Sequence, residues 1–266
     1  MTSDPVAGAV RSRASREPNV EPSRKRARRD LLFPSTSANC GWEMDFEITT
    51  GFPTSIGRWL VPDADALNRD LRALILAEET SYPSLGRCNI GGWHSRPDFL
   101  QRTQPGVATL TTWLTWAVRR MGEATAAGEF TDTVSVSSAW ATIWRTGAYD
   151  APHSHPDSSW SGVYYVDAGP RHPDHPLSGV LEFLDPHGDA EIAMAPGHPR
   201  GEPVRVRPES GLLVVFPSWL SHWVHPYAGH SPRIAVSFNA TAVAADQAIP
   251  LTPSFADTRH ALERSA

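Results

Sequence analysis

Cysteine is scarce, since the 266-residue sequence holds only Cys40 and Cys88. Two isolated thiols cannot build a disulfide framework, and they lack the close spacing of a cysteine zinc site. Reduced thiols are typical of a reducing compartment, so we expect a cytoplasmic protein.

Long apolar runs are also absent. No stretch approaches the roughly 18 residues that a membrane-spanning helix needs, and the first residues lack the apolar centre of a secretory signal. The formal net charge is only −5, so no positive excess would attract nucleic acid or an anionic membrane. We therefore expect neither of these as a partner, and the sequence leaves the oligomeric state open.

Basic residues gather in one segment of the chain. Residues 11–30 are polar and densely basic, which is typical of a solvated, disordered tail. The short run at residues 25–29 is alternatively a nuclear-localisation or anionic-surface patch. We expect a disordered basic tail over residues 1–37, one domain over residues 38–245, and a C-terminal tail or helix over residues 246–266.

Two segments carry the apolar stripe of an amphipathic helix, at residues 63–77 and 106–125. Asp63 follows a proline and suits the N-cap of the first. In both segments apolar side chains recur at helical spacing: Leu67, Leu71, Leu74 and Ile75 in the first, and Leu110, Trp113, Leu114, Ala117 and Met121 in the second. The sequence therefore predicts a helical layer over about residues 60–125.

From about residue 130 the pattern changes to short β-branched and aromatic runs, separated by Pro, Gly and Asp clusters. The runs cover residues 134–146, 161–167, 179–184, 204–207, 211–216 and 233–240. Strands over about residues 130–240 after a helical layer predict a mainly β fold with flanking helices. We expect a sandwich or barrel with the helices on one outer face.

Histidines provide the strongest functional pattern. His153 and His155 stand two positions apart, and alternate residues of a strand point to the same face, so both imidazoles could aim at one metal ion. A third ligand could come from His222 or His225. Such a set suits a non-haem Fe(II) site with open positions. Zinc in a hydrolase and ordinary loop histidines are the alternatives.

Other polar side chains are weaker candidates. His94 lies in a Gly-containing loop and could contact a substrate or a lid, and Glu182 could be an acid inside the barrel that needs a partner. Five histidines lie in Pro- and Gly-rich loops, where we expect surface positions without function: His172, His175, His187, His198 and His230.

The segments around the paired histidines occur in a distinctive order. "HSHP" at residues 153–156 precedes "SGVYYV" at 161–166, "LEFLDP" at 181–186, "FPSWLSHWVHPY" at 216–227 and "RIAVSFN" at 233–239. This order resembles a bacterial and phage group of 2OG-Fe(II) oxygenases, within the Fe(II)/2-oxoglutarate-dependent dioxygenase superfamily. The likeness extends from about residue 46 to about residue 240. It implies a double-stranded β-helix core of the jelly-roll or cupin-like kind.

The resemblance also implies a cofactor set of Fe(II), 2-oxoglutarate as co-substrate, and O₂. His222 matches the distal iron histidine. Arg233 matches the arginine whose planar fork grips the far carboxylate of 2-oxoglutarate. Ser237, on the same strand face as Arg233, and Tyr165 match positions that support that carboxylate. For these last two, plain structural roles are an equal alternative.

The histidine pair departs from the commonest pattern of the superfamily, which is H-x-D or H-x-E. In one register the ligands are His153, His155 and His222, and a likeness to aspartyl/asparaginyl hydroxylases favours this set. In the other, His155 and Asp157 form the H-x-D pair with His222. We favour the first register, which leaves the iron without a carboxylate ligand.

These features predict an Fe(II)- and 2-oxoglutarate-dependent oxygenase. The expected reaction is hydroxylation, or another oxidation, of a small molecule such as an amino acid derivative or secondary metabolite. Desaturation, cyclisation and halogenation use the same iron. Two other classes stay open: a three-histidine cupin-type dioxygenase that does not use 2-oxoglutarate, and a non-catalytic β-sandwich binding protein. Arg233 argues against the cupin-type dioxygenase, because an enzyme that does not use 2-oxoglutarate has no carboxylate for this arginine to bind.

Overall fold

The computed structural model describes residues 54–86, 89–186 and 203–243. The predicted tail over residues 1–37, its boundary with the domain, and the C-terminal segment 246–266 lie outside the described residues. So do both cysteines and the two loop histidines His187 and His198. Those predictions therefore stay predictions.

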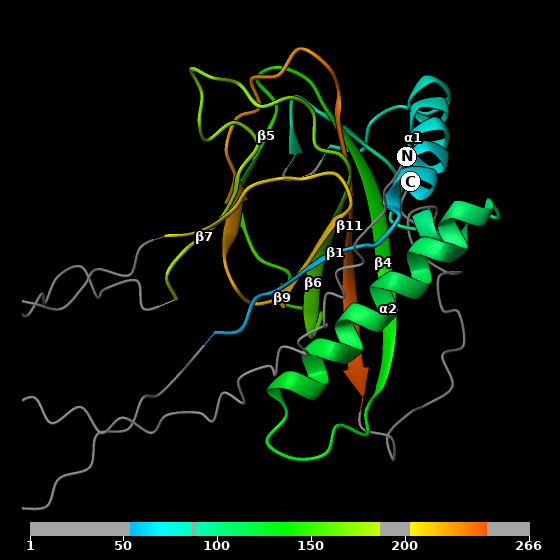
Figure 1. Ribbon diagram of the computed structural model, residues 1–266, viewed down its shortest axis with the longest axis vertical. Coiled ribbons are helices and arrows are strands. Elements are labelled where there is room, and N and C mark those ends of the chain that lie inside the picture. The colour runs from blue at the N-terminus through cyan, green and yellow to red at the C-terminus, as the bar shows by residue number, and fades with distance from the viewer. Residues whose placement is uncertain (1–53, 87–88, 187–202, 244–266) are drawn as a thin grey trace, which may run out of the picture. The chain divides into compact units, whose positions relative to one another are not determined.

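Two antiparallel sheets form the body of the fold (Figure 1). The larger sheet has six strands in the order β1 (Gly57–Leu60), β9 (Leu212–Pro217), β6 (Trp160–Asp167), β11 (Arg233–Val243), β4 (Thr133–Trp144) and β3 (Trp93–His94). The smaller sheet has five strands in the order β2 (Asn89–Ile90), β5 (Tyr149–His153), β10 (His222–Val224), β7 (Leu181–Phe183) and β8 (Val204–Val206).

The chain passes repeatedly from one sheet to the other. It runs from β4 in the larger sheet to β5 in the smaller one, back to β6, and across again to β7 and β8. It then returns to β9, crosses to β10 and ends in β11. Eight strands wound in this alternating way between two facing sheets form a double-stranded β-helix, which is the fold expected from the sequence.

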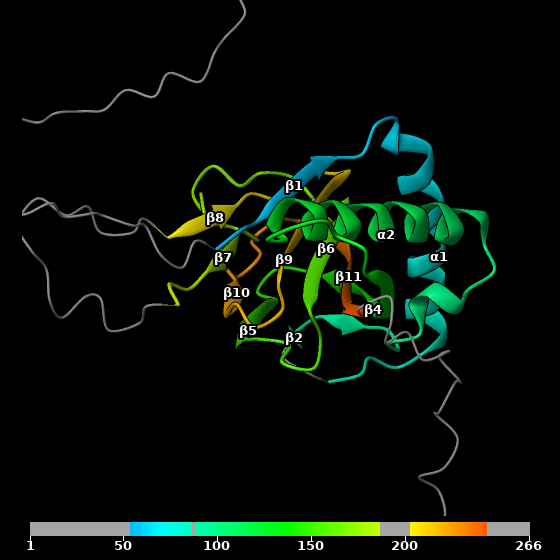
Figure 2. The same ribbon diagram turned by 90° about the horizontal axis from the view of Figure 1, so that it is seen from below.

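Helices cover the outer face of the larger sheet. They are α1 (Ala64–Ser81) and α2 (Pro105–Thr125), with a short 3₁₀ helix η1 (Phe99–Gln101) between them. Figure 2 shows α2 lying across this sheet on the side away from the smaller one. The two predicted helices are therefore present. In the described part of the chain no helix is long and apolar enough to cross a membrane.

Asp63 directly precedes α1, as the sequence predicts, but it does not cap the helix. Its backbone is left-handed, with φ of 51°, and its side chain makes no capping hydrogen bond. Aspartate tolerates this conformation better than most residues. The helix is instead held by its buried stripe of Leu67, Leu71 and Ile75, because packing of an amphipathic face outweighs propensity and caps.

Side chains along the strands of the larger sheet point alternately to its two faces, so the apolar core has two parts. Tyr164 belongs to the apolar cluster between that sheet and the helices, whereas its neighbour Tyr165 belongs to the cluster between the two sheets. In the same way Ile234 faces the helices and Ala235 faces the smaller sheet. The inner cluster surrounds the side chains that carry the chemistry.

Candidate metal centre and co-substrate pocket

Paired strands of the smaller sheet bring His153 and His222 together. β5 and β10 are antiparallel, and His153 lies directly opposite His222 in their register. His155 lies two residues beyond the end of β5, so the expected pair on a single strand face is only half formed. The loop is nevertheless fixed, because the His155 backbone N–H donates to the Ser218 carbonyl at 2.8 Å.

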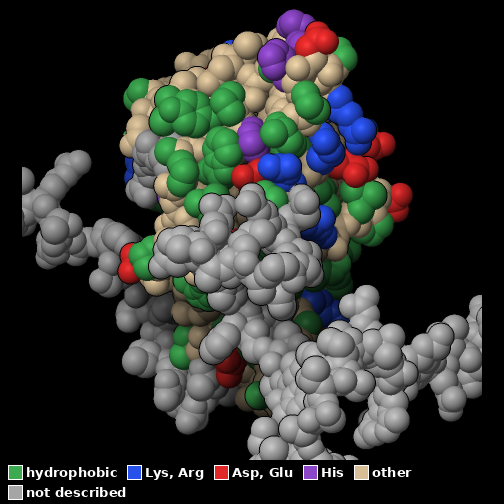
Figure 3. All heavy atoms as spheres, turned by 90° about the vertical axis from the view of Figure 1, so that its left-hand side faces the viewer, with side chains coloured by type: hydrophobic (Ala, Val, Ile, Leu, Met, Phe, Trp, Pro, Cys, Tyr) green, Lys and Arg blue, Asp and Glu red, His purple; other side chains and the backbone are tan. Residues whose placement is uncertain are grey.

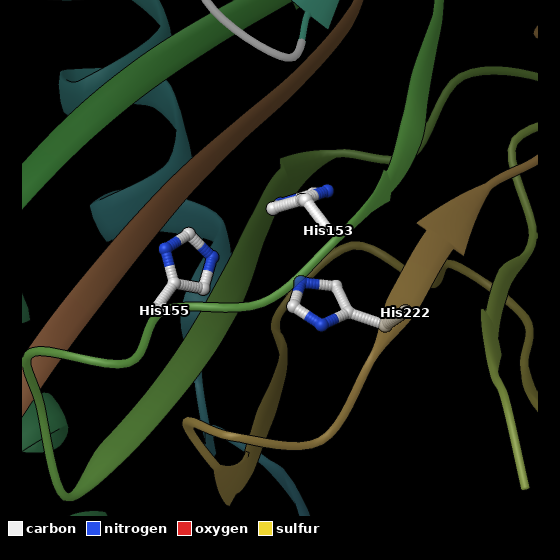
Figure 4. Close-up of side chains that lie close together, drawn as sticks. All are labelled: His153, His155 and His222. Atoms are coloured by element: carbon white, nitrogen blue, oxygen red, sulfur yellow. The ribbon is translucent and has the colours of Figure 1, made fainter. Parts of the chain in front are cut away.

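The three imidazoles converge on one point (Figure 4). Their ring centres lie 4.4 Å apart for His153 and His222, 5.0 Å for His153 and His155, and 5.4 Å for His155 and His222. Each ring offers one nitrogen, and these three atoms all lie within 4.8 Å of one another. Three nitrogen donors at this spacing can share a single metal ion.

Backbone carbonyls fix the tautomer of two of these rings. Nδ1 of His153 lies 2.7 Å from the Ala151 carbonyl oxygen, and Nδ1 of His222 lies 2.8 Å from that of Leu220. Because a carbonyl oxygen only accepts, each Nδ1 carries the hydrogen and donates it. Nε2 of both rings therefore keeps its lone pair, which is the form that a metal binds.

Burial keeps His155 and His222 neutral. Loss of solvent, and to a smaller extent the nearby His153, lower the pKa of His222 to about 3. The same two causes lower the pKa of His155 to about 4. Phe216 packs edge-on against His222 at 4.7 Å and contributes to this desolvation. A metal ion would therefore not compete with protons for these two rings near neutral pH.

The alternative ligands lie elsewhere. Asp157 is exposed in a turn and is not a member of the cluster. His225 belongs to the outer face of the smaller sheet, where its Nε2 lies 3.1 Å from Glu182 Oε2. Glu182 also accepts hydrogen bonds from Trp223 and Arg205. Glu182 pairs with Trp223, and both side chains lie on the face of the smaller sheet opposite to His222. The expectation that Glu182 faces the barrel interior is therefore wrong.

A cavity of about 40 Å³ lies between the sheets and gathers the predicted co-substrate residues. Arg233, Ser237 and Tyr165 all line it. It begins beside the histidines, because Phe216 both lines the cavity and packs against the His222 ring.

Arg233 is the unusual group in this cavity. It is only 3% exposed, and its guanidinium carbon lies over the rings of Trp144, at 4.4 Å, and Tyr165, at 5.0 Å. One terminal nitrogen donates to the Gly179 carbonyl at 3.5 Å, whereas Arg233 Nε and Tyr165 Oη are buried without a hydrogen-bond partner. Within the described residues Arg233 forms no ion pair.

Burial of Arg233 and Tyr165 disfavours their charged forms. Burial lowers the pKa of Arg233 and raises that of Tyr165. A buried cation that faces a cavity and lacks an anionic partner is strongly unfavourable unless a ligand supplies the charge. The cavity therefore suits a carboxylate.

Sequence reasoning missed Asp150, which also lines the cavity. The pKa of Asp150 is raised, because burial outweighs the opposing effect of the nearby His153 and Arg233. One residue of β10, Trp223, lies opposite two residues of β5 at this point, since His222 pairs with His153 and Val224 pairs with Asp150. A β-bulge of this kind re-aims a side chain, so only the partner strand's register could have revealed that Asp150 faces inward.

Aromatic rings border the triad on its other side. Trp140 lies 5.7 Å from His155, and His94 stacks on Trp140 at 5.7 Å with ring planes only 10° apart. His94 is 2% exposed, and its Nδ1 lies 2.6 Å from the Ser95 carbonyl oxygen. His94 therefore contacts Trp140, and Trp140 forms the wall next to His155.

One family model matches the part of the chain that carries the site. Residues 138–239 match the family model described as "Putative 2OG-Fe(II) oxygenase". This segment runs from β4 into β11 and contains the three histidines, Arg233 and the cavity. No curated protein matches the chain.

Solved structures resemble the described fold. One is a prolyl hydroxylase from Trichoplax adhaerens in complex with a peptide fragment of hypoxia inducible factor, with 15% identity, a TM-score of 0.51, and coverage of 71% of this chain and 83% of that one. Another is the epimerase SnoN in complex with Fe³⁺, α-ketoglutarate and nogalamycin RO, with 12% identity, a TM-score of 0.51, and coverage of 77% and 88%. At these identities the likeness shows the fold. With the family match, it follows that the chain carries a 2OG-Fe(II) oxygenase domain and is an Fe(II)/2-oxoglutarate-dependent dioxygenase.

Proposed function

We propose that His153, His155 and His222 are the iron ligands of this oxygenase. The observation that carries the proposal is the pair of backbone hydrogen bonds that leave Nε2 free on His153 and His222. Second partners of this kind orient ligating histidines in metal sites. The three donor atoms are also close enough to share one ion.

The same geometry favours three histidines over the register with Asp157. That carboxylate is exposed and lies outside the cluster. Use of Asp157 would require the turn after His155 to move, although the His155 N–H is tied to Ser218. Neutral ligands leave the full charge of Fe(II) at the centre, and Asp150 is the acid among the residues that line the adjoining cavity.

For the co-substrate, we infer that Arg233 binds the far carboxylate of 2-oxoglutarate, with Ser237 and Tyr165 beside it. All three line one cavity. The unpartnered Arg233 Nε and Tyr165 Oη are the donors that an incoming carboxylate would satisfy. A guanidinium fork can hold a carboxylate through two parallel hydrogen bonds.

Fe(II) and 2-oxoglutarate, when bound, supply oxidation of a substrate by O₂ with release of succinate and CO₂. The protein's own residues orient the reactants and exclude water. Phe216 shields His222, and Trp144 closes the cavity beside Arg233. Trp140 walls the space next to His155.

We propose hydroxylation of a small molecule, such as an amino acid derivative or secondary metabolite. SnoN is in complex with a small molecule, whereas the Trichoplax adhaerens enzyme is in complex with a peptide, so the fold is compatible with both. The stacked rings of Trp140 and His94 favour a compact, partly flat substrate at this wall.

Anaerobic titration of Fe(II) and 2-oxoglutarate into the metal-free protein tests the site. The chelate gives a weak visible charge-transfer band, which we expect in the wild type and in Asp157→Ala but not in His153→Ala. Loss of the band in Asp157→Ala, with retention in His153→Ala, would move the ligand set to His155, Asp157 and His222. No band despite bound Fe(II) would instead favour a cupin-type dioxygenase that does not use 2-oxoglutarate.

The co-substrate assignment has a matched control. Arg233→Gln should abolish the band at concentrations of 2-oxoglutarate that saturate the wild type. Arg96→Gln changes an exposed arginine that does not line the cavity, and should leave the band unchanged. Substrate class is then tested by succinate release. Addition of the true substrate should stimulate release above the uncoupled rate, and stimulation by peptides but by no small molecule would overturn the small-molecule proposal.

A further inference from the structure

Three further histidines lie close together on two loops, away from the iron ligands. His172 and His175 belong to the segment between β6 and β7, and His230 belongs to the segment between β10 and β11. We call these three side chains the loop histidine cluster. Histidine side chains gather at the upper end of the face in Figure 3, beside an acidic side chain.

A tight turn places His172 and His175 side by side. The His175 N–H donates to the His172 carbonyl at 3.3 Å across Pro173 and Asp174. Proline at the second position of such a turn is favoured because its φ is already fixed. The turn leaves the two ring centres 4.6 Å apart with an angle of 53° between their planes.

The second loop is fastened to the first and to the barrel. The Ala228 N–H donates to Ser178 Oγ at 2.8 Å, which joins the two loops directly. Thr146 Oγ1 donates to the Gly229 carbonyl at 2.8 Å. His230 thereby lies with its ring centre 6.1 Å from that of His172.

One pair of this cluster resembles a pair of the iron ligands, although within the described residues only the triad brings three donor atoms within 4.8 Å of one another. His153 and His222 have ring centres 4.4 Å apart and an angle of 54°, nearly the values of the pair on the turn. In addition, Nδ1 of His172 is buried and has no hydrogen-bond partner. A buried polar atom without a partner calls for an explanation such as an ion, and the surface-only interpretation of His172 does not provide one.

We propose that the loop histidine cluster is a second metal site, which binds a divalent transition metal ion such as zinc. Zinc takes imidazole and carboxylate ligands in a four-coordinate shell, and imidazole is also a ligand for nickel and copper. His175 and His230 are exposed, so their rings can rotate toward His172 as an ion binds. The exposed Asp174 lies between the two histidines of the turn and can supply a carboxylate.

Space for the remaining ligands is present. A hollow of about 340 Å³ is lined by His172, His175 and Ser178, together with the prolines of this loop. Arg171 and Arg207 also line the hollow, and their positive charge opposes a bound cation. Water can complete the coordination shell. The site is therefore expected to exchange its ion more readily than the buried triad.

An ion bound here would connect the two segments that flank Arg233. Gly179, at the end of the first loop, accepts a hydrogen bond from Arg233, and the second loop leads directly into Arg233 at the start of β11. Metal binding would therefore fasten the end of the barrel behind the cavity. The expected effect is slower amide hydrogen exchange in both loops, whether or not iron or 2-oxoglutarate is bound.

Zinc titration of tag-free, metal-free protein tests this inference. We expect about two zinc ions per chain in the wild type, a tight one at the triad and a weaker one at the loops. The double variant His172→Gln/His230→Gln should bind only the tighter ion. His225→Gln removes a histidine outside both sites and should keep two.

Hydrogen exchange localises the second ion without reference to activity. Zinc beyond the first equivalent should slow exchange in residues 169–178 and 226–232 of the wild type, and not in the loop double variant. A variant lacking His153 and His222 should retain this protection, so failure of the iron assignment and failure of the loop site are distinguishable. A single zinc ion in wild type and loop variant alike, without loop protection, would overturn the proposal.

Discussion

Two groups of three histidines lie among the described residues, and what holds the rings differs between them more than the spacing of their leading pairs does. The leading pair of each group has nearly the same separation, 4.4 Å for His153 and His222 and 4.6 Å for His172 and His175. The first pair is carried by paired strands, and both rings donate to backbone carbonyls. The second pair is carried by a four-residue turn, and Nδ1 of His172 has no partner.

The difference separates a preorganised site from one that an ion must organise. Rings fixed by strand register and by second hydrogen bonds lose little entropy when a metal binds. Exposed rings on a loop must give up rotamer freedom at that moment, which weakens binding. Close histidines therefore indicate where a metal could bind, whereas burial and orientation decide how tightly.

Removal of His222 is expected to have the largest effect. It carries the most buried ring of the triad and its tautomer is fixed, so His222→Ala should weaken Fe(II) binding beyond the roughly 10- to 100-fold that loss of an outer partner costs. Isothermal titration with Fe(II) under anaerobic conditions measures the change. His172→Ala is the matched control, and an equal loss of iron in that variant would erase the distinction between the two clusters.

The next largest effect is expected at the co-substrate cavity. Arg233→Gln removes the charge that a bound carboxylate pairs with, and truncation of one partner of a buried charged pair costs about 2–5 kcal/mol. We therefore expect the Kd for 2-oxoglutarate to rise at least about 30-fold. Fluorescence titration can follow this through Trp144, which packs on Arg233. An unaltered Kd would remove Arg233 from the binding site.

Acid should destabilise the metal-free protein through the buried triad. The pKa of His222 is about 3 and that of His155 about 4 in the folded protein, against 6.5 for an unperturbed histidine. Between these values the unfolded chain binds more protons, so the free energy of unfolding falls as pH drops below 6.5. Down to pH 5 the loss is at most on the order of 2 kcal/mol per ring, and less for the partly exposed His155.

Urea unfolding at pH 7 and pH 5, with chelator present, measures this loss. His222→Gln should show a smaller loss of stability between the two pH values than the wild type, because one of the two rings that must stay neutral is gone. Comparison of the two proteins cancels the carboxylates that both share. Identical pH dependence in both would mean that the buried ring is not kept neutral by folding.

Much of this architecture could be predicted because it depends on local patterns. The apolar stripes of α1 and α2 and the runs that form β4, β6 and β11 follow simple periodicities. Convergence of His153 with His222 and the burial of Arg233 came from recognising segments in a fixed order. Predicting these features requires only the residues of each segment and the order of the segments along the chain.

The remainder depends on contacts between distant segments. Asp150 faces the cavity only because a bulge offsets β5 against β10, and Glu182 faces outward because it pairs with Trp223. The loop histidine cluster forms because the hydrogen bond from Ala228 to Ser178 joins two loops 50 residues apart. None of these relations leaves a periodic trace in the sequence.

The smallest effect is expected from His230, and it sharpens the contrast between the clusters. His230 is exposed on its loop, so His230→Gln should change the free energy of unfolding of the metal-free protein by less than about 0.5 kcal/mol. It should also leave the loss of stability between pH 7 and pH 5 as in the wild type, unlike His222→Gln. With zinc added in excess of one equivalent, the wild type should gain stability that His230→Gln lacks, because an ion that binds only the folded state stabilises it by mass action. Equal gains in both proteins would show that His230 takes no part in binding, whereas a large loss without metal would mean that this ring is a structural element of the loop.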